Sequence, residues 1–526
     1  MSAPGPAFSP ESRRQNLERL RAEELDVLIV GGGINGAGIA RDLALRARDA
    51  GMPLRVGLVE QRHFASGTSG RNSQLIHGGL RYLKQLEFHL VRESLRERAA
   101  LLDIAPHLVA PLPFLIPFYS WPARLYYCAG LRLYEFLSGS RKIGRLRYLS
   151  SAEVLAAEPG LAPAGLAGGA IYYDCRVNAA RGVLENVFDA ARAGAVIANY
   201  ARAERITATG ATVVDALSGQ SFPVRARKVV DATGPWETGS RIRLVRGSHL
   251  ILPRLNAGDH AIAFFEDAGR IVFVIPWSGG ALSLVGTTDV DHEGSPDDVS
   301  ISPDEVGYLL AIVRRLYPGA GDLRPIAAYS ALRALVRDHA ASPTETSREH
   351  RIWNAEDGVL HVAGGKYTTY RLMSEEAAER VVREIAPPLA GRSATAQTPL
   401  GGNTRARLAE LGASLPELAA RHCLEEARLR PLASDYGVQL PHLLACLPAG
   451  EAELDRLRRA QIAYAVRHEM AHRLADFLFV STYWGFEQPW TAENLLPVSR
   501  EMAGHLGWND SAIQAEIELA LRVRRY

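Results

Sequence analysis

Three glycines near the start of the chain have the spacing of a turn that can approach a diphosphate. Gly31, Gly33 and Gly36 follow the apolar run LDVLIV and precede a stretch with helical periodicity that extends to about Ala50. Glycines let the backbone pass close to a pyrophosphate, and the N-terminus of the following helix offers amide donors and a favourable dipole. Glu60 ends the next apolar run, LRVGLVE, where a carboxylate can accept hydrogen bonds from ribose hydroxyls. The pattern predicts a dinucleotide-binding βαβ unit.

Two later glycine turns indicate which dinucleotide is bound. Ala232, Thr233 and Gly234 follow the apolar run KVVD, and Gly364 and Gly365 follow GVLHVA and precede a predicted helix. A nucleotide-binding domain split in this way is typical of FAD enzymes. The late turn can place backbone amides beside the pyrimidine edge of a flavin, where they would stabilise the reduced anionic ring. The sequence therefore predicts FAD as the cofactor.

The order of the apolar runs predicts an α/β fold. The βαβ unit requires a parallel sheet with a right-handed crossover, whereas the extended segments 245–254, 270–277, 281–290 and 327–337 are typical of an antiparallel sheet. We expect a Rossmann-like FAD-binding domain with an inserted antiparallel-sheet substrate domain, followed by an α-helical domain. The predicted boundaries are an N-terminal arm at 1–24, the interleaved domains at 25–397 with the substrate part mainly at 85–225 and 245–345, and the helical domain at 398–526.

Composition excludes several classes of protein. The chain has 526 residues, of which 47% are hydrophobic and 22% charged, with a net charge of +2, so nothing favours nucleic-acid binding. Its four cysteines include no CxxC pair, which favours a reducing compartment. We expect no secretory signal and no membrane-spanning helix. The region from Pro106 to Tyr134 mixes basic, aromatic and apolar residues, as either a membrane-surface contact or a folded subdomain would.

Seven ordered blocks give the sequence a more specific resemblance. They are VGGGINGAGIARD, FASGTSGRNSQLIHGGLRYL, DATGPW, RGSHLILPR, IVFVIPW, LVGTTDVDHEG and AGGKYTTYR. Over most of its length the chain resembles the FAD-dependent, quinone-linked aerobic glycerol-3-phosphate dehydrogenases. The resemblance implies oxidation of sn-glycerol 3-phosphate to dihydroxyacetone phosphate, with hydride transfer to the flavin and electrons passed to membrane quinone. It also implies a cytoplasmic enzyme attached to the inner face of the cell membrane, and a homodimer.

The resemblance also implies which side chains bind the substrate. Candidates for the phosphate are Arg81, Arg333 and Arg348, because the planar guanidinium suits a dianionic phosphate, and Tyr82 adds a hydroxyl. Asp289 matches an acidic position near the substrate, although an ordinary turn aspartate explains it equally well.

Candidates for the proton acceptor are His77 and His249, and the sequence does not choose between them. Lys366 can polarise the substrate oxygen or lie near the flavin. A Ser/Thr-rich turn at Thr68 to Ser73 is expected to follow the flavin. The expected cofactor contacts are Gly31, Gly33, Ile34, Asn35, Gly36, Glu60, Thr68, Ser69, Ser73, Ala232, Thr233, Gly234, Gly364, Gly365, Lys366 and Thr368.

Three features depart from this interpretation. Gln74 stands where many relatives have lysine, and Ala334 follows the substrate arginine where many have proline. The run from His468 to His472 fits the zinc pattern HExxH, in which two histidines share a metal and the glutamate acts as a base. No third ligand is evident and an amphipathic helix explains the flanking residues, so we expect no metal site.

Other functions remain open on the sequence alone. A glycerol-3-phosphate oxidase would pass the electrons to oxygen and release hydrogen peroxide. A related amine or amino-acid oxidase would keep the fold and need no phosphate group. The non-enzymatic alternatives are a flavin-bound scaffold or a metal-dependent module built on HExxH.

Overall fold

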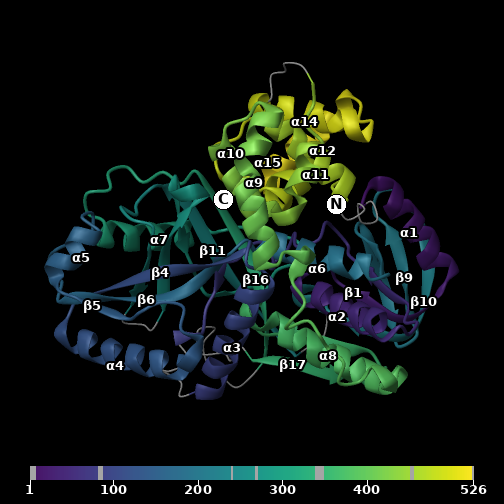
Figure 1. Cartoon of the computed structure of the whole chain (residues 1–526), viewed down its shortest axis with the longest axis horizontal. Helices are drawn as coiled ribbons and strands as arrows, with labels where there is room; N and C mark the ends of the chain where they lie inside the picture. Colours follow the sequence, from purple (N-terminus) through teal and green to yellow (C-terminus); the bar gives the residue numbers. More distant parts are fainter. Residues whose placement is uncertain are drawn as a thin grey trace.

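The structure contains two sheets, each assembled from distant parts of the chain. It is a computed structural model that describes residues 8–80, 87–237, 241–266, 270–337, 349–449 and 455–523. Figure 1 shows the two sheets side by side, with the C-terminal helices grouped above them. The expected α/β class with a helical C-terminal part is confirmed.

The first sheet carries the predicted βαβ unit. Strand β1 (Glu24–Val30) pairs in parallel with β2 (Val56–Val59) on one side and with β10 (Ser221–Asp231) on the other. The side chains of β1 after Glu24 are all buried, which explains the continuous apolar run in the sequence. The carboxyl ends of these parallel strands therefore share one edge, where such sheets bind ligands. The sheet is completed by β7 (Val196–Ala198), β8 (Ala201–Thr207), β9 (Gly210–Asp215), β17 (His350–Asn354) and β18 (Leu360–Gly364).

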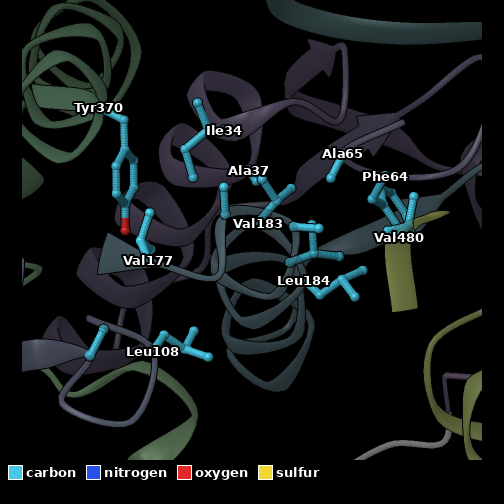
Figure 2. Packing of buried hydrophobic residues seen from close by; sticks show 14 of the residues in the cluster. Ile34, Ala37, Phe64, Ala65, Leu108, Val177, Val183, Leu184, Tyr370 and Val480 are labelled. Carbon is cyan, nitrogen blue, oxygen red and sulfur yellow. The ribbon is translucent and has the colours of Figure 1, made fainter. Parts of the chain in front are cut away.

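The helix that follows the first glycine turn is held by buried contacts. Helix α2 (Ile34–Ala50) packs against α6 (Ala179–Arg192) and α8 (Tyr370–Ile385). Figure 2 shows residues of α2 beside Val183 and Leu184 of α6, and both of these side chains are fully buried. Burying a side chain of this size contributes roughly 1.5–3 kcal/mol. This packing fixes the N-terminus of α2, which faces the nucleotide site.

The second sheet is mainly antiparallel, as expected. Its long strand β11 (Ile242–Pro253) pairs with β16 (Ala327–Val336) along its length and with β14 (Leu282–Gly286) on its other edge. Helix α7 (Pro303–Leu316) packs against β11. The other strands are β3 (Leu75–Ile76), β4 (Val109–Phe118), β5 (Arg147–Leu149), β6 (Gly168–Val177), β12 (Ala261–Phe265), β13 (Ile271–Trp277) and β15 (Val290–Asp291).

One predicted range contains elements of both sheets. We expected the substrate part to extend over 85–225, but α6, β7, β8 and β9 lie within that range and belong with the first sheet. The second sheet leaves this part of the chain at the end of β6. The hairpin of β8 and β9 is antiparallel, and alternation in an antiparallel strand looks the same in either domain.

Both ends of the described chain contact the nucleotide-binding part. Helix α1 (Pro10–Ala22) lies within the expected N-terminal arm. It is fixed by the buried Arg13, whose guanidinium lies 2.6 Å from the carboxylate of Asp215 in β9. The C-terminal helices have an apolar cluster of their own, and Arg181 of α6 forms a buried ion pair with Glu469 at their base. These helices are α9 (Arg405–His422), α10 (Glu426–Tyr436), α11 (Leu440–Leu444), α12 (Arg456–His468), α13 (Leu474–Asp476), α14 (Ala492–Leu506) and α15 (Asp510–Val523).

The HExxH run does not lie on one helix. Helix α12 ends at His468, and Met470 has a positive φ of 56°, so the two histidines are not on successive turns. His472 packs against the ring of Tyr200, while Glu469 pairs with Arg181. Over the described ranges, no group of three or more metal-ligating side chains is arranged to hold a metal ion. The run therefore has a structural explanation in this fold.

The region from Pro106 to Tyr134 forms β4 and helix α4 (Trp121–Ser138). Figure 1 shows α4 at the outer edge of the second sheet, near α3 (Phe88–Ile104), with α5 (Ser151–Ala157) on the other side of β5 and β6. Several large apolar side chains of α4 are exposed. Among the described helices, none has the length and apolar character needed to cross a bilayer.

Candidate active site

A cavity of about 790 Å³ is lined by residues from both sheets. Its walls include the glycine turn after β1, the carboxyl end of β2, the Thr68 to Ser73 turn, and residues of β11, β16 and β18. The volume falls in the range of ligand and cofactor sites. Because segments from one half of the chain face segments from the other half, the cavity exists only in the assembled fold.

The first glycine turn is built for close backbone approach. Gly31 has a φ of 107°, and a Cβ on it would lie 2.5 Å from the carbonyl oxygen of Ala232. A Cβ on Gly36 would overlap the carbonyl oxygen of Gly31. Gly33 caps α2 without a side-chain hydrogen bond, the Ile34 amide donates to the hydroxyl of Ser69 at 2.9 Å, and Gly33, Ile34 and Asn35 all line the cavity. This is a cradle for a diphosphate.

Glu60 is fixed at the end of β2 beside this turn. One carboxylate oxygen accepts a hydrogen bond from the Gly32 amide at 2.6 Å, and the other accepts one from the Arg62 amide at 2.8 Å. Burial raises the pKa of Glu60, while these two amide bonds act in the opposite direction. The carboxylate therefore has a defined orientation at the cavity wall.

The two later turns also reach the cavity. The amide and hydroxyl of Thr233 donate to Asp231 at 2.9 and 2.6 Å, which fixes the turn after β10. Gly364 and Gly365 both have a positive φ, at 77° and 78°, in the turn after β18. This left-handed backbone suits glycine, and both residues line the cavity. Lys366 follows, and its ammonium group donates to Ser94 of α3 at 2.6 Å.

His249 lies in the wall formed by the second sheet. Its Nε2 is 2.8 Å from the hydroxyl of Ser73, and its ring stacks on Tyr329 with a centroid separation of 5.0 Å. The residue is only 2% exposed. Burial, with a smaller effect of the positive charge on Arg333, lowers the pKa of His249 to about 3, so its ring is neutral near pH 7.

Arg333 of β16 is held rigidly at the cavity. Its guanidinium donates to Asp289 at 2.7 Å, to the carbonyl of Thr288 at 3.1 Å and to the hydroxyl of Thr287 at 2.9 Å. Gly247 lies beside it, and a Cβ there would overlap the guanidinium. The expected acidic position, Asp289, therefore orients the arginine.

His77 lies beside the late glycine turn. Its amide donates to the hydroxyl of Thr368 at 3.2 Å, and its side chain lines the cavity with that of Lys366. It is partly exposed, in contrast to His249. The site therefore contains two histidines in different environments, one enclosed and neutral and one open to the cavity.

The structure brings together nearly all of the predicted site residues that it describes. Fifteen of the expected cofactor contacts line the cavity, and Gly36 lies behind the turn as packing support. His77, His249, Arg333 and Lys366 line it as well. Arg81, Tyr82 and Arg348 lie outside the described residues.

Sequence reasoning missed several residues of this site. Tyr172 and Asp174 of β6 and Phe273 of β13 line the cavity, but they lie in strands with no sequence motif to mark them. Gln74, noted only as a departure, accepts a hydrogen bond from the Ala179 amide at 2.9 Å and so ties the end of the Thr68 to Ser73 turn to α6.

The fold and the site together define a flavin-dependent oxidoreductase. Residues 26–380 match the model of the FAD dependent oxidoreductase family, and residues 393–513 match that of the C-terminal domain of alpha-glycerophosphate oxidase. The chain is 34% identical to a glycerol-3-phosphate dehydrogenase of Synechocystis sp., covering 96% of this chain and 97% of the relative. It is 33% identical to glycerol-3-phosphate dehydrogenase 2 of Mycobacterium tuberculosis, covering 98% and 90%.

A solved structure supports the same assignment. The glycerol-3-phosphate dehydrogenase from Bacillus halodurans, complexed with FAD, has a TM-score of 0.80 and 26% identity, and the match covers 98% of each chain. This chain belongs to the FAD-dependent glycerol-3-phosphate dehydrogenase family. Its cofactor is FAD, as expected, and the glycine cradle and the Glu60 carboxylate fit that molecule.

The glycine cradle predicts the effect of a single methyl group. Gly36→Ala would place a Cβ against the Gly31 carbonyl, which is backbone and can move only if the turn opens. We expect the purified variant to lose most of its flavin, measured by absorbance per mole of protein. Gly307→Ala in α7 is the matched control, because a Cβ there meets nothing within 4 Å. A full flavin content in Gly36→Ala would contradict the cradle.

Proposed function

We propose that this enzyme oxidises sn-glycerol 3-phosphate to dihydroxyacetone phosphate and passes the electrons to membrane quinone. The observation that carries the substrate is Arg333, an arginine held by Asp289 in the wall of the flavin cavity. Relatives of similar length carry the name glycerol-3-phosphate dehydrogenase. When bound, FAD supplies the hydride acceptor.

Arg333 is the group best suited to the substrate phosphate. Its three interactions with residues 287–289 fix the plane of the guanidinium, so little side-chain entropy is lost on binding. A dianionic phosphate would then form charge-assisted hydrogen bonds with it. Arg81, Tyr82 and Arg348 remain further candidates for the same phosphate.

His77 is the better candidate for the proton acceptor. Oxidation of the secondary alcohol releases a hydride from carbon and a proton from oxygen, and the proton needs an acceptor within hydrogen-bond reach. His77 is partly exposed in the cavity lining, whereas His249 is only 2% exposed. In this proposal His249 orients Ser73 beside the flavin, and Lys366 polarises the substrate oxygen.

Anaerobic titration of the holoenzyme with sn-glycerol 3-phosphate tests this proposal. We expect the flavin absorbance to bleach, and glycerol to have no effect at equal concentration. Arg333→Gln should raise the half-saturating concentration roughly ten- to a hundredfold, because it removes a hydrogen bond between charged groups. Arg337→Gln is the matched control, since that arginine lies on the same stretch of chain and bonds the Ile242 carbonyl. Equal bleaching by glycerol would contradict the phosphate site, and stoichiometric peroxide in air would favour the oxidase.

The two histidines should respond differently to pH. Because the pKa of His249 lies at about 3, its ring does not titrate in the usual assay range and cannot cause a loss of kcat/KM on the acid side. We expect any such acid limb to disappear in His77→Asn and to keep its position in His249→Asn, measured from the pH profile of kcat/KM. The reverse pattern would make His249 the acceptor.

Helix α4 is the proposed membrane contact. Trp121, Leu125, Tyr126 and Phe136 are 64%, 71%, 54% and 77% exposed, which is unusual for such large apolar side chains. The segment after the helix adds an exposed set of cations, namely Arg141, Lys142, Arg145 and Arg147. An apolar face flanked by positive charge suits a bilayer with anionic lipids, because the apolar side chains can enter the bilayer while the cations contact the headgroups. Quinone is dissolved in the same bilayer.

Sedimentation with vesicles tests this contact. We expect the holoenzyme to sediment with vesicles of phosphatidylglycerol and phosphatidylcholine, and high salt to weaken binding by screening the basic segment. The double variant Leu125→Asp, Phe136→Asp should remain in the supernatant. Leu519→Asp is the control, because Leu519 is an exposed leucine on α15 at the other end of the chain. If the double variant bound vesicles as well as the wild type, the membrane contact could not be the exposed face of α4.

A further inference from the structure

The inner face of α4 reaches the segment that bears His77. Tyr134 is 3% exposed, although its neighbours Leu133 and Phe136 are open to solvent. The Tyr134 hydroxyl donates to Asp174 at 2.7 Å and accepts a hydrogen bond from the Gly78 amide at 3.0 Å. Burial raises the pKa of Tyr134 well above its ordinary value, so the hydroxyl keeps its proton. One side chain of the surface helix is thus bonded to the residue next to His77.

The same network also holds the end of α4. Asp174 pairs with Arg98 of α3 at 2.6 Å, in a position where both side chains are almost fully buried. Arg98 also donates to the carbonyl of Arg141, directly after α4, at 3.1 Å. Asp174 accepts from the Gly78 amide at 3.2 Å as well. Helix α4 is therefore tied to the Gly78 segment through Tyr134 and, at its C-terminal end, through Arg98 and Asp174.

Close packing leaves this segment little freedom. A Cβ on Gly78 would overlap the Tyr134 hydroxyl, so the backbone and the ring are already in contact. On the other side, the His77 amide and carbonyl both meet the hydroxyl of Thr368, in the late glycine turn. The His77–Gly78 backbone is thus held between α4 and the Thr368 segment. Because the packing is close, a displacement of α4 must also displace this backbone or the Thr368 segment.

We infer that Tyr134 is a positioning residue that couples the contact of α4 with a membrane surface to the placement of His77. This rests on the proposed membrane contact and on the proposed role of His77. The coupling needs no change in overall fold, because a small shift of α4 moves the Gly78 amide through one hydrogen bond. In this way the enzyme would work best when it lies on the membrane that holds its electron acceptor.

Tyr134→Phe tests the coupling, with Tyr148→Phe as the matched control. The Tyr148 hydroxyl also bonds α4, at the Cys128 carbonyl, but is not part of the Gly78 network. Holoenzymes are assayed with a soluble dye acceptor, so that quinone supply plays no part, with and without vesicles of phosphatidylglycerol and phosphatidylcholine. We expect vesicles to raise kcat/KM severalfold in the wild type and in Tyr148→Phe. Tyr134→Phe should bind vesicles and flavin normally, show no vesicle response, and have a displaced acid limb in its pH profile.

The outcomes separate this inference from the function on which it rests. If Tyr134→Phe responds to vesicles like the wild type, or if the wild type binds vesicles without a response, the coupling is overturned and the membrane contact stands. If the wild type does not bind vesicles, the membrane proposal fails, and an unchanged pH profile in Tyr134→Phe then overturns the positioning role too. Should Tyr134→Phe not yield folded holoenzyme, Arg98→Lys, which shortens the link to the Arg141 carbonyl, must show the same loss of response.

Discussion

The site depends on the parallel pairing of β1 with β10, two strands separated by more than a third of the chain. This pairing places the Gly31 backbone against the Ala232 carbonyl, at a distance that no side chain would allow. Two glycine turns are thereby brought to one edge of the sheet, with Glu60 next to them. The third turn, at Gly364, follows because β18 pairs in parallel with β10. The cofactor cradle is therefore a product of strand order more than of any one motif.

The second sheet sets the charge and orientation of two side chains that face this cradle. His249 is enclosed so that it stays neutral, and Arg333 is paired with Asp289 so that its charge has one orientation. Both lie on the adjacent strands β11 and β16, which places them within one wall of the cavity. Glycines at 247 and 286 leave the space that these two side chains occupy. The positions of Arg333 and His249 in the site thus depend on glycines in the neighbouring strands.

Sequence predicted what is encoded locally. The Gly31 turn, Glu60 and the late glycines could be recognised because each lies at a fixed offset from an apolar strand. The position of the β8–β9 hairpin could not, since alternation does not tell which sheet a strand joins. The Tyr134 network was also out of reach, because it joins residues 78, 98, 134 and 174, whose contacts leave no periodic signal. Likewise, only burial distinguished His249 from His77.

The strand order has a consequence for how the protein is made. Of the first sheet, β1 can meet β2 early in synthesis, but it needs β10 before its other edge is covered, and β10 needs β18. The ribosome therefore has to synthesise roughly the first 370 residues before the FAD site can be complete. Until then β1 presents an apolar, unpaired edge, a state that favours aggregation and recruits chaperones. We expect flavin supply in the cell to govern the yield of folded protein, since the cofactor can stabilise only the finished pairing.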